Sequence, residues 1–179
     1  MPSGPASRSE PLVVLGVDPG LTVTGWGVGV ADGVDSEALR SLDCGAIATK
    51  RSQPQEERLH QIFRELCDVI QRYQPSEVAV EDPFVGENVR SAFAIGAARS
   101  VCLLAAAQAG LPVRPYSPAE VKLVVTGYGR SDKTQVQEMV RVQLNLPEAP
   151  ASADAADALA VALCHHLRQR ADARLERAQ

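Results

Sequence analysis

The sequence of 179 residues has few aromatic side chains and no surplus of positive charge. Phe, Trp and Tyr make up 4% of it, and 18 Lys and Arg stand against 22 Asp and Glu, giving a formal net charge of −4. This balance argues against a protein that coats nucleic acid through bulk charge. No stretch approaches the roughly 18 consecutive apolar residues of a membrane span, so the sequence excludes one.

Cysteine and histidine are also scarce, and neither forms a metal-binding motif. The four cysteines are scattered, without a CxxC pair: Cys44, Cys67, Cys102 and Cys164. We expect buried free thiols in a reducing cytoplasm. The adjacent His165 and His166 cannot point the same way on one helix. The first eleven residues, MPSGPASRSEP, lack the apolar core of a secretory signal and are expected to form a disordered leader.

The composition that remains is that of one globular domain, with 45% hydrophobic and 22% charged residues. Residues 12–17, LVVLGV, form an apolar run that predicts a central strand buried on both faces. Residues 23–30 alternate in the manner of a strand, and a third strand is expected at about 38–48. The chain should therefore begin with an antiparallel meander.

Helical periodicity then begins at Pro54 and ends at Pro75. We expect a strand at 77–81, an Ala- and Gly-rich helix at about 88–109 and a strand at 111–116. Helices should follow at about 118–125, 132–144 and 152–170. This order predicts an α/β fold with a five-stranded mixed sheet and helices on both faces. The expected division is a leader at 1–11, a domain at 12–167 and an Arg-rich helical or disordered tail at 168–179.

Two acids end hydrophobic strands. Asp18 follows the first strand directly and Glu81 ends the fourth, at the edge where open α/β sheets place their sites. If the two strands are parallel neighbours, the carboxylates lie about 5 Å apart, and like charges so close favour a metal ion or a shared proton between them. The alternative is that Asp18 only caps the Asp-Pro-Gly turn.

Two further acids, Asp154 and Asp157, lie three residues apart at the start of the last helix, among Ala and Leu. They could simply compensate the helix dipole. On a helix packed against the sheet, however, unpaired carboxylates are costly, and a cation would relieve that cost. Four oxygen donors without His or Cys favour Mg²⁺ or Mn²⁺ over zinc. Two such ions about 3.5–4 Å apart can hold the attacking water and the leaving oxygen around a phosphodiester.

Five segments together resemble the RuvC family, the bacterial Holliday-junction endonucleases of the ribonuclease H-like superfamily. They are GVDPGLTVTGWGV, VEDPF, NVRSAFAIGAAR, VKLVVTGYGRSDKTQVQEMV and ADAADALAVALCH. The resemblance covers about residues 12–167. It implies a ribonuclease H-like fold and a homodimeric, metal-dependent enzyme of DNA recombination and repair. Such an enzyme nicks a four-way DNA junction symmetrically, leaves 5′-phosphates and works with the branch-migration proteins RuvA and RuvB.

The resemblance also assigns roles to single residues. Asp18, Glu81, Asp154 and Asp157 match the family's acidic tetrad, which would hold two divalent ions, Mg²⁺ with Mn²⁺ as an alternative. Lys122 and Lys133 match lysines needed near the DNA backbone, with Lys133 assigned to catalysis as well; without the resemblance they would be read as solvated surface lysines. Phe84 matches an aromatic that stacks on a base, although a single Phe is more often part of a core.

Other positions are less specific. Arg90, Arg99 and Arg130 could contact phosphates as generic basic residues. Asp82 stands where family members commonly have Gln, which places a negative charge near DNA. The small side chains of residues 92–107 suit either a core helix or, as in the family, a dimer interface, and two symmetric cuts need two related active sites.

Three rivals remain to be weighed. A nucleotide-hydrolysing enzyme of the actin and sugar-kinase type needs a second copy of the fold, for which there is no room. A ribonuclease H-like nuclease acting on RNA or RNA–DNA hybrids would share the metal chemistry. A junction-binding protein without catalysis would not need all four acids. The charge is unevenly distributed, since residues 88–141 hold seven basic and three acidic residues. DNA binding should therefore depend on a local basic face and on the metal-loaded site.

Overall fold

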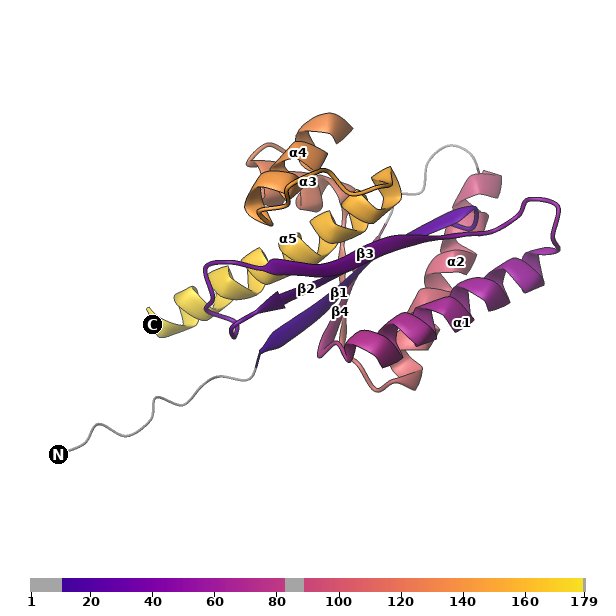
Figure 1. The fold of residues 1–179 in the computed structure, drawn as a ribbon, viewed down its shortest axis with the longest axis horizontal. Coiled ribbons are helices and arrows are strands. Elements are labelled where there is room, and N and C mark those ends of the chain that lie inside the picture. Colours follow the sequence, from indigo (N-terminus) through magenta and orange to yellow (C-terminus); the bar gives the residue numbers. More distant parts are fainter. Residues whose placement is uncertain (1–10, 83–88, 179) are drawn as a thin grey trace.

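Five strands form one mixed sheet in a computed structural model that describes residues 11–82 and 89–178. The strand order across the sheet is β3-β2-β1-β4-β5 (Figure 1). The strands are β1 (Leu12–Asp18), β2 (Val23–Ala31), β3 (Arg40–Ala48), β4 (Glu77–Glu81) and β5 (Val113–Tyr116). β1, β2 and β3 pair antiparallel, and β4 and β5 run parallel to β1. The expected meander and the mixed α/β sheet are confirmed.

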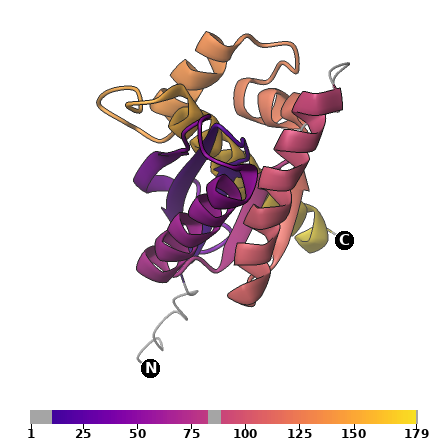
Figure 2. The same cartoon turned by 90° about the vertical axis from the view of Figure 1, so that its right-hand side faces the viewer.

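Helices cover both faces of this sheet. α1 (Gln55–Tyr73) and α2 (Val89–Gln108) lie side by side on one face, and α5 (Ala153–Arg177) crosses the other (Figures 1 and 2). α3 (Pro118–Thr126) and α4 (Lys133–Gln143) pack on α5. Each connection between parallel strands therefore passes through a helix, as parallel pairing requires.

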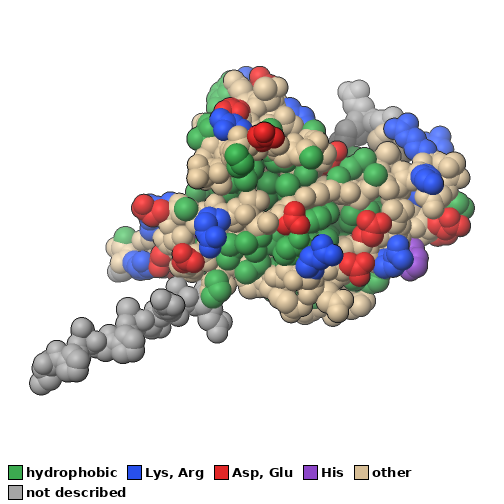
Figure 3. Space-filling model, viewed as in Figure 1, with side chains coloured by type: hydrophobic (Ala, Val, Ile, Leu, Met, Phe, Trp, Pro, Cys, Tyr) green, Lys and Arg blue, Asp and Glu red, His purple; other side chains and the backbone are tan. Residues whose placement is uncertain are grey.

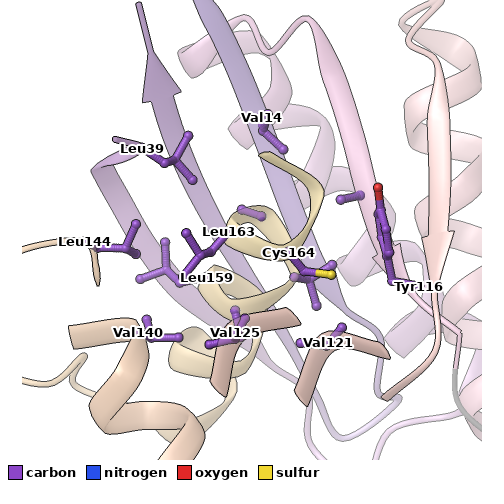
Figure 4. Packing of buried hydrophobic residues seen from close by; sticks show 14 of the residues in the cluster. Val14, Leu39, Tyr116, Val121, Val125, Val140, Leu144, Leu159, Leu163 and Cys164 are labelled. Carbon is purple, nitrogen blue, oxygen red and sulfur yellow. The ribbon is translucent and has the colours of Figure 1, made fainter. Parts of the chain in front are cut away.

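The sheet separates two apolar cores, and the alternation of side chains along β1 decides which residue enters which core. Leu15 and Val17 pack with α1 and α2. Val14 faces the core of α3, α4 and α5, where it lies with Leu159 and Val140 (Figure 4). Asp18 follows Val14 and Gly16 at intervals of two and so belongs to the α5 face.

α2 combines two apolar surfaces. Ala98, Cys102 and Ala105 are buried against α1, whereas Phe93 and Leu104 are exposed on the outer side. By length and composition alone, α2 could cross a membrane. The lack of a long uninterrupted apolar run therefore does not by itself exclude a membrane span, contrary to the conclusion drawn from the sequence.

α5 runs further than its apolar pattern indicates. The periodicity predicts an end near residue 170, but the helix continues to Arg177. Ion pairs hold the extension: Arg170 and Arg174 bind Glu37, and Arg177 binds Asp35. Both acids lie in the β2–β3 connection, which apolar periodicity in α5 cannot reveal.

All four cysteines are free thiols. Cys102 and Cys164 are buried, while Cys44 and Cys67 are partly exposed. The expectation of four buried thiols is thus wrong for two of them.

Candidate functional site

Asp18 and Glu81 lie next to each other at the carboxyl ends of β1 and β4. The parallel register pairs Val17 with Val80, so the next residue on each strand is an acid. The two carboxyl groups share a side-chain hydrogen bond. The pairing inferred from the sequence is therefore present, and Asp18 does more than cap a turn.

This arrangement raises both pKa values. Burial is the main cause for Asp18, followed by the charges of Asp157 and Asp154, and its pKa rises to about 6. Burial and then the charge of Asp18 raise the pKa of Glu81 to about 8. Desolvation and like charge both disfavour the doubly ionised state, so the carboxyl pair retains a proton. A cation between the two carboxyl groups would relieve the repulsion of their charges and could replace that proton.

Glycines on the sheet allow α5 to approach it closely. A Cβ atom at Gly25 would lie 2.0 Å from the backbone oxygen of Asp154, and one at Gly16 would lie 2.1 Å from the backbone oxygen of Ala158. Any larger residue at these positions would push the helix away from β1 and β2. The glycines therefore help to bring the first two turns of α5, with their two acids, to the end of the sheet that carries Asp18.

The cap of α5 shows that its acids are not needed for capping. Ser152 is the N-cap, and its Oγ accepts a hydrogen bond from the Ala155 N–H at 3.1 Å. Asp154 and Asp157 follow in the first two turns, where the helix dipole favours negative charge. Both acids act on the Asp18 carboxyl, whose pKa they raise through their charge.

Lys133 extends into this acidic group from α4. Its Nζ lies 2.6 Å from Oδ2 of Asp157, and this hydrogen bond is the main reason that the pKa of Lys133 is raised. A capping box fixes the start of the helix: Gln135 N–H donates to Oδ1 of Asp132, and the Gln135 side chain accepts from the Asp132 N–H. Lys133 is the first residue after that cap.

A cavity of about 270 Å³ joins the acids and the lysines. Its lining residues are Asp18, Glu81, Pro118, Val121, Lys122, Lys133, Val136, Asp157 and Ala160. Five of the residues singled out from the sequence thus line one concave surface, although each comes from a different element: β1, β4, α3, α4 or α5. Asp154 lies beside it in the first turn of α5.

Polar contacts that were not predicted from the sequence fix the connection between α3 and α4. Thr126 Oγ1 lies 2.6 Å from Ser131 Oγ and donates to the Lys122 carbonyl at 2.7 Å. These contacts link the turn of α3 that carries Lys122 to the residues just before Lys133. The Ser and Thr that flank Gly127-Tyr128-Gly129 were the available signal.

Asp82 does not leave an uncompensated charge. Nε of Arg99, on α2, lies 3.1 Å from its Oδ1. From the sequence, Arg99 was interpreted as a generic phosphate contact, whereas in the structure its guanidinium balances the charge of Asp82.

Arg90 and Arg130, two of the predicted DNA contacts, are not among the residues that line the cavity. Arg90 is exposed in the first turn of α2, and Arg130 is exposed between α3 and α4. Phe84 lies outside the described residues. Both arginines are thus accessible to a polyanion, but the contacts recorded for the cavity do not include them.

The donor set fits a hard divalent cation. Asp18, Glu81, Asp154 and Asp157 supply only carboxylate oxygens, which suit Mg²⁺ or Mn²⁺. Over residues 11–82 and 89–178, no three His, Cys, Asp or Glu side chains are arranged as ready-made ligands. Asp157 is paired with Lys133, and Asp18 with Glu81, so ligation requires these side chains to exchange partners.

Comparison with known proteins covers almost the whole chain. The family described as "Crossover junction endodeoxyribonuclease RuvC" matches residues 14–165. A relative of the same name from Chloroflexus aggregans is 52% identical over 151 residues, which are 84% of this chain and 90% of that protein.

Two solved structures extend the comparison. "T. thermophilus RuvC in complex with Holliday junction substrate" is 38% identical, with a TM-score of 0.84 over 90% of this chain and 96% of that one. The yeast mitochondrial Holliday junction resolvase Ydc2 is 15% identical with a TM-score of 0.60, over 96% and 84%, and shows a shared fold only. On the extent of these matches, the chain belongs to the RuvC family of crossover junction endodeoxyribonucleases.

Proposed function

We propose that this protein resolves four-way DNA junctions by metal-dependent hydrolysis at Asp18, Glu81, Asp154 and Asp157. The observation that carries the proposal is the cavity in which strand-end acids, acids of the first turns of α5 and two lysines converge. Support for the substrate comes from the Thermus relative, whose structure is titled as a complex with a Holliday junction and overlays this chain at a TM-score of 0.84.

The acids would hold two Mg²⁺ ions, with Asp18 between them because it neighbours Glu81 on one side and the α5 acids on the other. When bound, such ions activate water and stabilise the charge that develops on a phosphodiester. Glu81 would ligate from one side, and Asp154 and Asp157 from the other. Mn²⁺ has the same preference for oxygen and should also support the reaction.

The lysines would position the DNA. Lys122 and Lys133 line the wall of the cavity opposite β1 and β4, on α3 and α4. As compact cations with three donors each, they suit phosphate oxygens. Lys133 also contacts Asp157, so its ammonium can hold a phosphate close to the carboxylates and thereby contribute to catalysis.

Local placement of charge, more than total charge, governs this binding. Acidic and basic side chains are interspersed over the face shown in Figure 3, in keeping with the net charge of −4. Contacts with several phosphates still release counterions, so we expect junction binding to weaken as salt rises. Arg90, Arg130 and Phe84 are proposed to extend the contact beyond the cavity.

A homodimer would supply the second active site. The outer face of α2 is apolar and lined by small residues around a hollow formed by Val89, Ala92, Phe93, Gly96, Ala97 and Ser100. Small side chains let two helices approach closely, and a two-fold dimer matches the symmetry of a four-way junction. The family resemblance adds RuvA and RuvB as partners and the cytoplasm as the place of action.

The test compares labelled substrates under single-turnover conditions. A mobile four-way junction, a linear duplex and an RNA–DNA hybrid of equal length are each incubated with Mg²⁺, Mn²⁺ or chelator. Paired nicks at symmetric positions, bearing ligatable 5′-phosphates, are expected on the junction alone and only with metal. Equal cutting of the linear duplex would contradict the assignment, and preferential cutting of the hybrid would favour a ribonuclease.

A further inference from the structure

A buried histidine joins α5 to both parallel strands that follow β1 in the sheet. His165 is fully buried, and its two ring nitrogens have separate partners: Nδ1 lies 2.9 Å from the Tyr116 hydroxyl and Nε2 lies 2.9 Å from Oε2 of Glu77. Gln169, one turn further along α5, donates to the same Glu77 oxygen at 2.7 Å. None of these four residues touches the proposed catalytic cavity.

The chemistry of the partners fixes where the protons lie. A carboxylate oxygen accepts, so the hydrogen between Glu77 and His165 is placed on Nε2. In that neutral tautomer, which burial of the ring favours by lowering the pKa of His165 against the opposing charge of Glu77, Nδ1 accepts from the Tyr116 O–H. Every member therefore has one defined direction of donation, and the linkage is satisfied at one rotation of the histidine ring.

The spacing of residues along β4 and α5 relates the His165 contacts to the position of the acids at the catalytic end of the sheet. Glu77 and Glu81 lie on the same face of β4, four residues or about 13 Å apart. His165 and Asp157 lie eight residues apart on α5, a rise of about 12 Å along the helix axis. Because these lengths nearly match, contact between His165 and Glu77 sets Asp157 at the level of Glu81.

Tyr116 connects the same histidine to the catalytic end of the sheet. It is the register partner of Glu81, and its carbonyl accepts from the Asp82 N–H at 2.7 Å. The next residue, Ser117, caps α3, which carries Lys122. Displacing Tyr116 would therefore disturb the end of β4, which carries Glu81, and the start of α3, which carries Lys122.

Near the acids, the contact of α5 with β1 and β2 lacks such directionality, and the other ion pairs of α5 with the sheet and its connections, such as Arg114 with Asp172, lie beyond His165 toward its carboxyl end. At the β1 and β2 crossing, glycines meet the helix backbone and small side chains such as Ala162. A surface of this kind permits close approach but defines the axial position of a helix weakly, whereas hydrogen bonds tolerate displacements of only a few tenths of an ångström.

We propose that His165 is a positioning residue, which acts through Glu77 and Tyr116 to set the axial position of α5 and so the placement of Asp157 against Asp18 and Glu81. The inference rests on the proposed function of those acids. It assigns a role in metal binding and cleavage to residues that contact neither the metal nor the DNA.

The experiment compares the unmodified full chain with three single variants of it, Tyr116→Phe, Glu77→Gln and His165→Leu. Tyr116→Phe removes only the hydroxyl that donates to Nδ1. Glu77→Gln keeps a side chain of equal size that can still accept from Nε2, and it serves as the conservative variant. Ile62→Ala, in α1 on the opposite face of the sheet, is the control for lost stability without any contact to α5. Three quantities are measured: the melting temperature, Mn²⁺ affinity by calorimetry without DNA, and the single-turnover rate on a junction.

We expect Tyr116→Phe and His165→Leu to weaken Mn²⁺ binding at least fivefold and to slow cleavage at least tenfold. The junction affinity of both variants, measured with Ca²⁺, should stay within twofold of that of the unmodified chain. Glu77→Gln should retain most of the cleavage rate of the unmodified chain. Ile62→Ala should lose melting temperature but keep Mn²⁺ affinity and rate.

Unchanged Mn²⁺ affinity and rate in Tyr116→Phe would overturn the inference, as would an equal loss of both in Ile62→Ala. The Tyr116→Phe comparison keeps the test open if His165→Leu does not fold. Absence of metal-dependent cleavage by the unmodified chain would instead contradict the proposed function. The Mn²⁺ affinities of the variants would in that case still show whether the His165 contacts affect metal binding at Asp157.

Discussion

The ammonium of Lys133 lies 2.6 Å from Oδ2 of Asp157, so the basic residue proposed to hold DNA phosphate is paired with a proposed metal ligand. Lys133 begins α4 and Asp157 lies in the second turn of α5, two elements that meet only through tertiary packing. Metal binding and phosphate binding at this site are therefore expected to be linked, since both change the partners of one ion pair.

Substitution of this lysine tests that link. Lys133→Ala should lower the single-turnover cleavage rate by at least tenfold and junction affinity by less than threefold, because one phosphate contact contributes little to total binding. Lys50→Ala, at an exposed turn after β3, is the matched control and should leave both unchanged. Parallel losses of rate and affinity in Lys133→Ala would reduce Lys133 to a simple phosphate anchor.

The approach of α5 to the sheet should be sensitive to a single methyl group. In Gly25→Ala the added Cβ meets the Asp154 backbone oxygen, which the fold can relieve only by moving the helix. We expect a loss of about 2 kcal/mol or more in the free energy of unfolding, in the range of overpacked cores, and a large loss of cleavage.

Gly129→Ala provides the comparison for that substitution. Its Cβ would have no neighbour closer than 3.5 Å, so the free energy of unfolding should stay within about 0.5 kcal/mol. Urea unfolding measures both variants. If Gly25→Ala were as stable and active as Gly129→Ala, the close packing of α5 would not position the acids.

Much of this site could be predicted because its signals are local. An apolar strand that ends in an acid indicates a carboxylate at the edge of a sheet, and Asp18 and Glu81 both follow that pattern. The acids of α5 stood out because they interrupt a row of small apolar residues. Family resemblance then added the two lysines, and the structure brings both to the same cavity.

Contacts between distant segments could not be predicted in the same way. Nothing in the local pattern links Arg99 to Asp82, or the arginines at the end of α5 to Glu37. The glycines of β1 and β2 read as ordinary strand residues until α5 is seen to lie against them. Apolar periodicity ended α5 too early because ion pairs, which have no periodicity, stabilise its last turns.

The outer face of α2 should be the dimer interface. Phe93 is 75% exposed there, and Phe93→Asp would place a charge in a closely packed contact. We expect a shift from dimer to monomer by light scattering and a loss of coupling between the two nicks. Leu175→Asp, at another exposed apolar position near the end of α5, should remain dimeric. A dimeric Phe93→Asp variant would place the interface elsewhere.

His166 should contribute a loss of stability in mild acid, opposite in sign to the contribution of Asp18 and Glu81, whose raised pKa values favour the folded state as the pH falls. This side chain is fully buried, and burial lowers its pKa below the ordinary value of 6.5. As the pH falls below 6.5, the unfolded chain binds a proton before the folded chain does, so the contribution of His166 to the free energy of unfolding decreases. The decrease continues until the lower pKa of the folded state is reached.

Paired substitutions isolate that contribution. Relative to the unmodified chain, His166→Leu should gain stability as the pH falls from 7.5 to about 5.5, a range that begins above the pKa of a free histidine. His60→Leu, at an exposed position of α1, is the matched control. Identical pH profiles for His166→Leu and the unmodified chain would contradict the expected contribution.

Asp18, held beside Glu81 and close to the acids of α5, is the residue on which the proposed metal-dependent cleavage depends most. The most direct test of this dependence is the single-turnover rate at which Asp18→Asn cuts a mobile four-way junction in Mg²⁺, with junction affinity measured in parallel. Asn keeps the size of the side chain and removes its charge. We expect Asp18→Asn to lose at least a thousandfold in rate and to retain its affinity for the junction. Cleavage within tenfold of the rate of the unmodified chain would show that Asp18 does not hold the metal that the reaction needs.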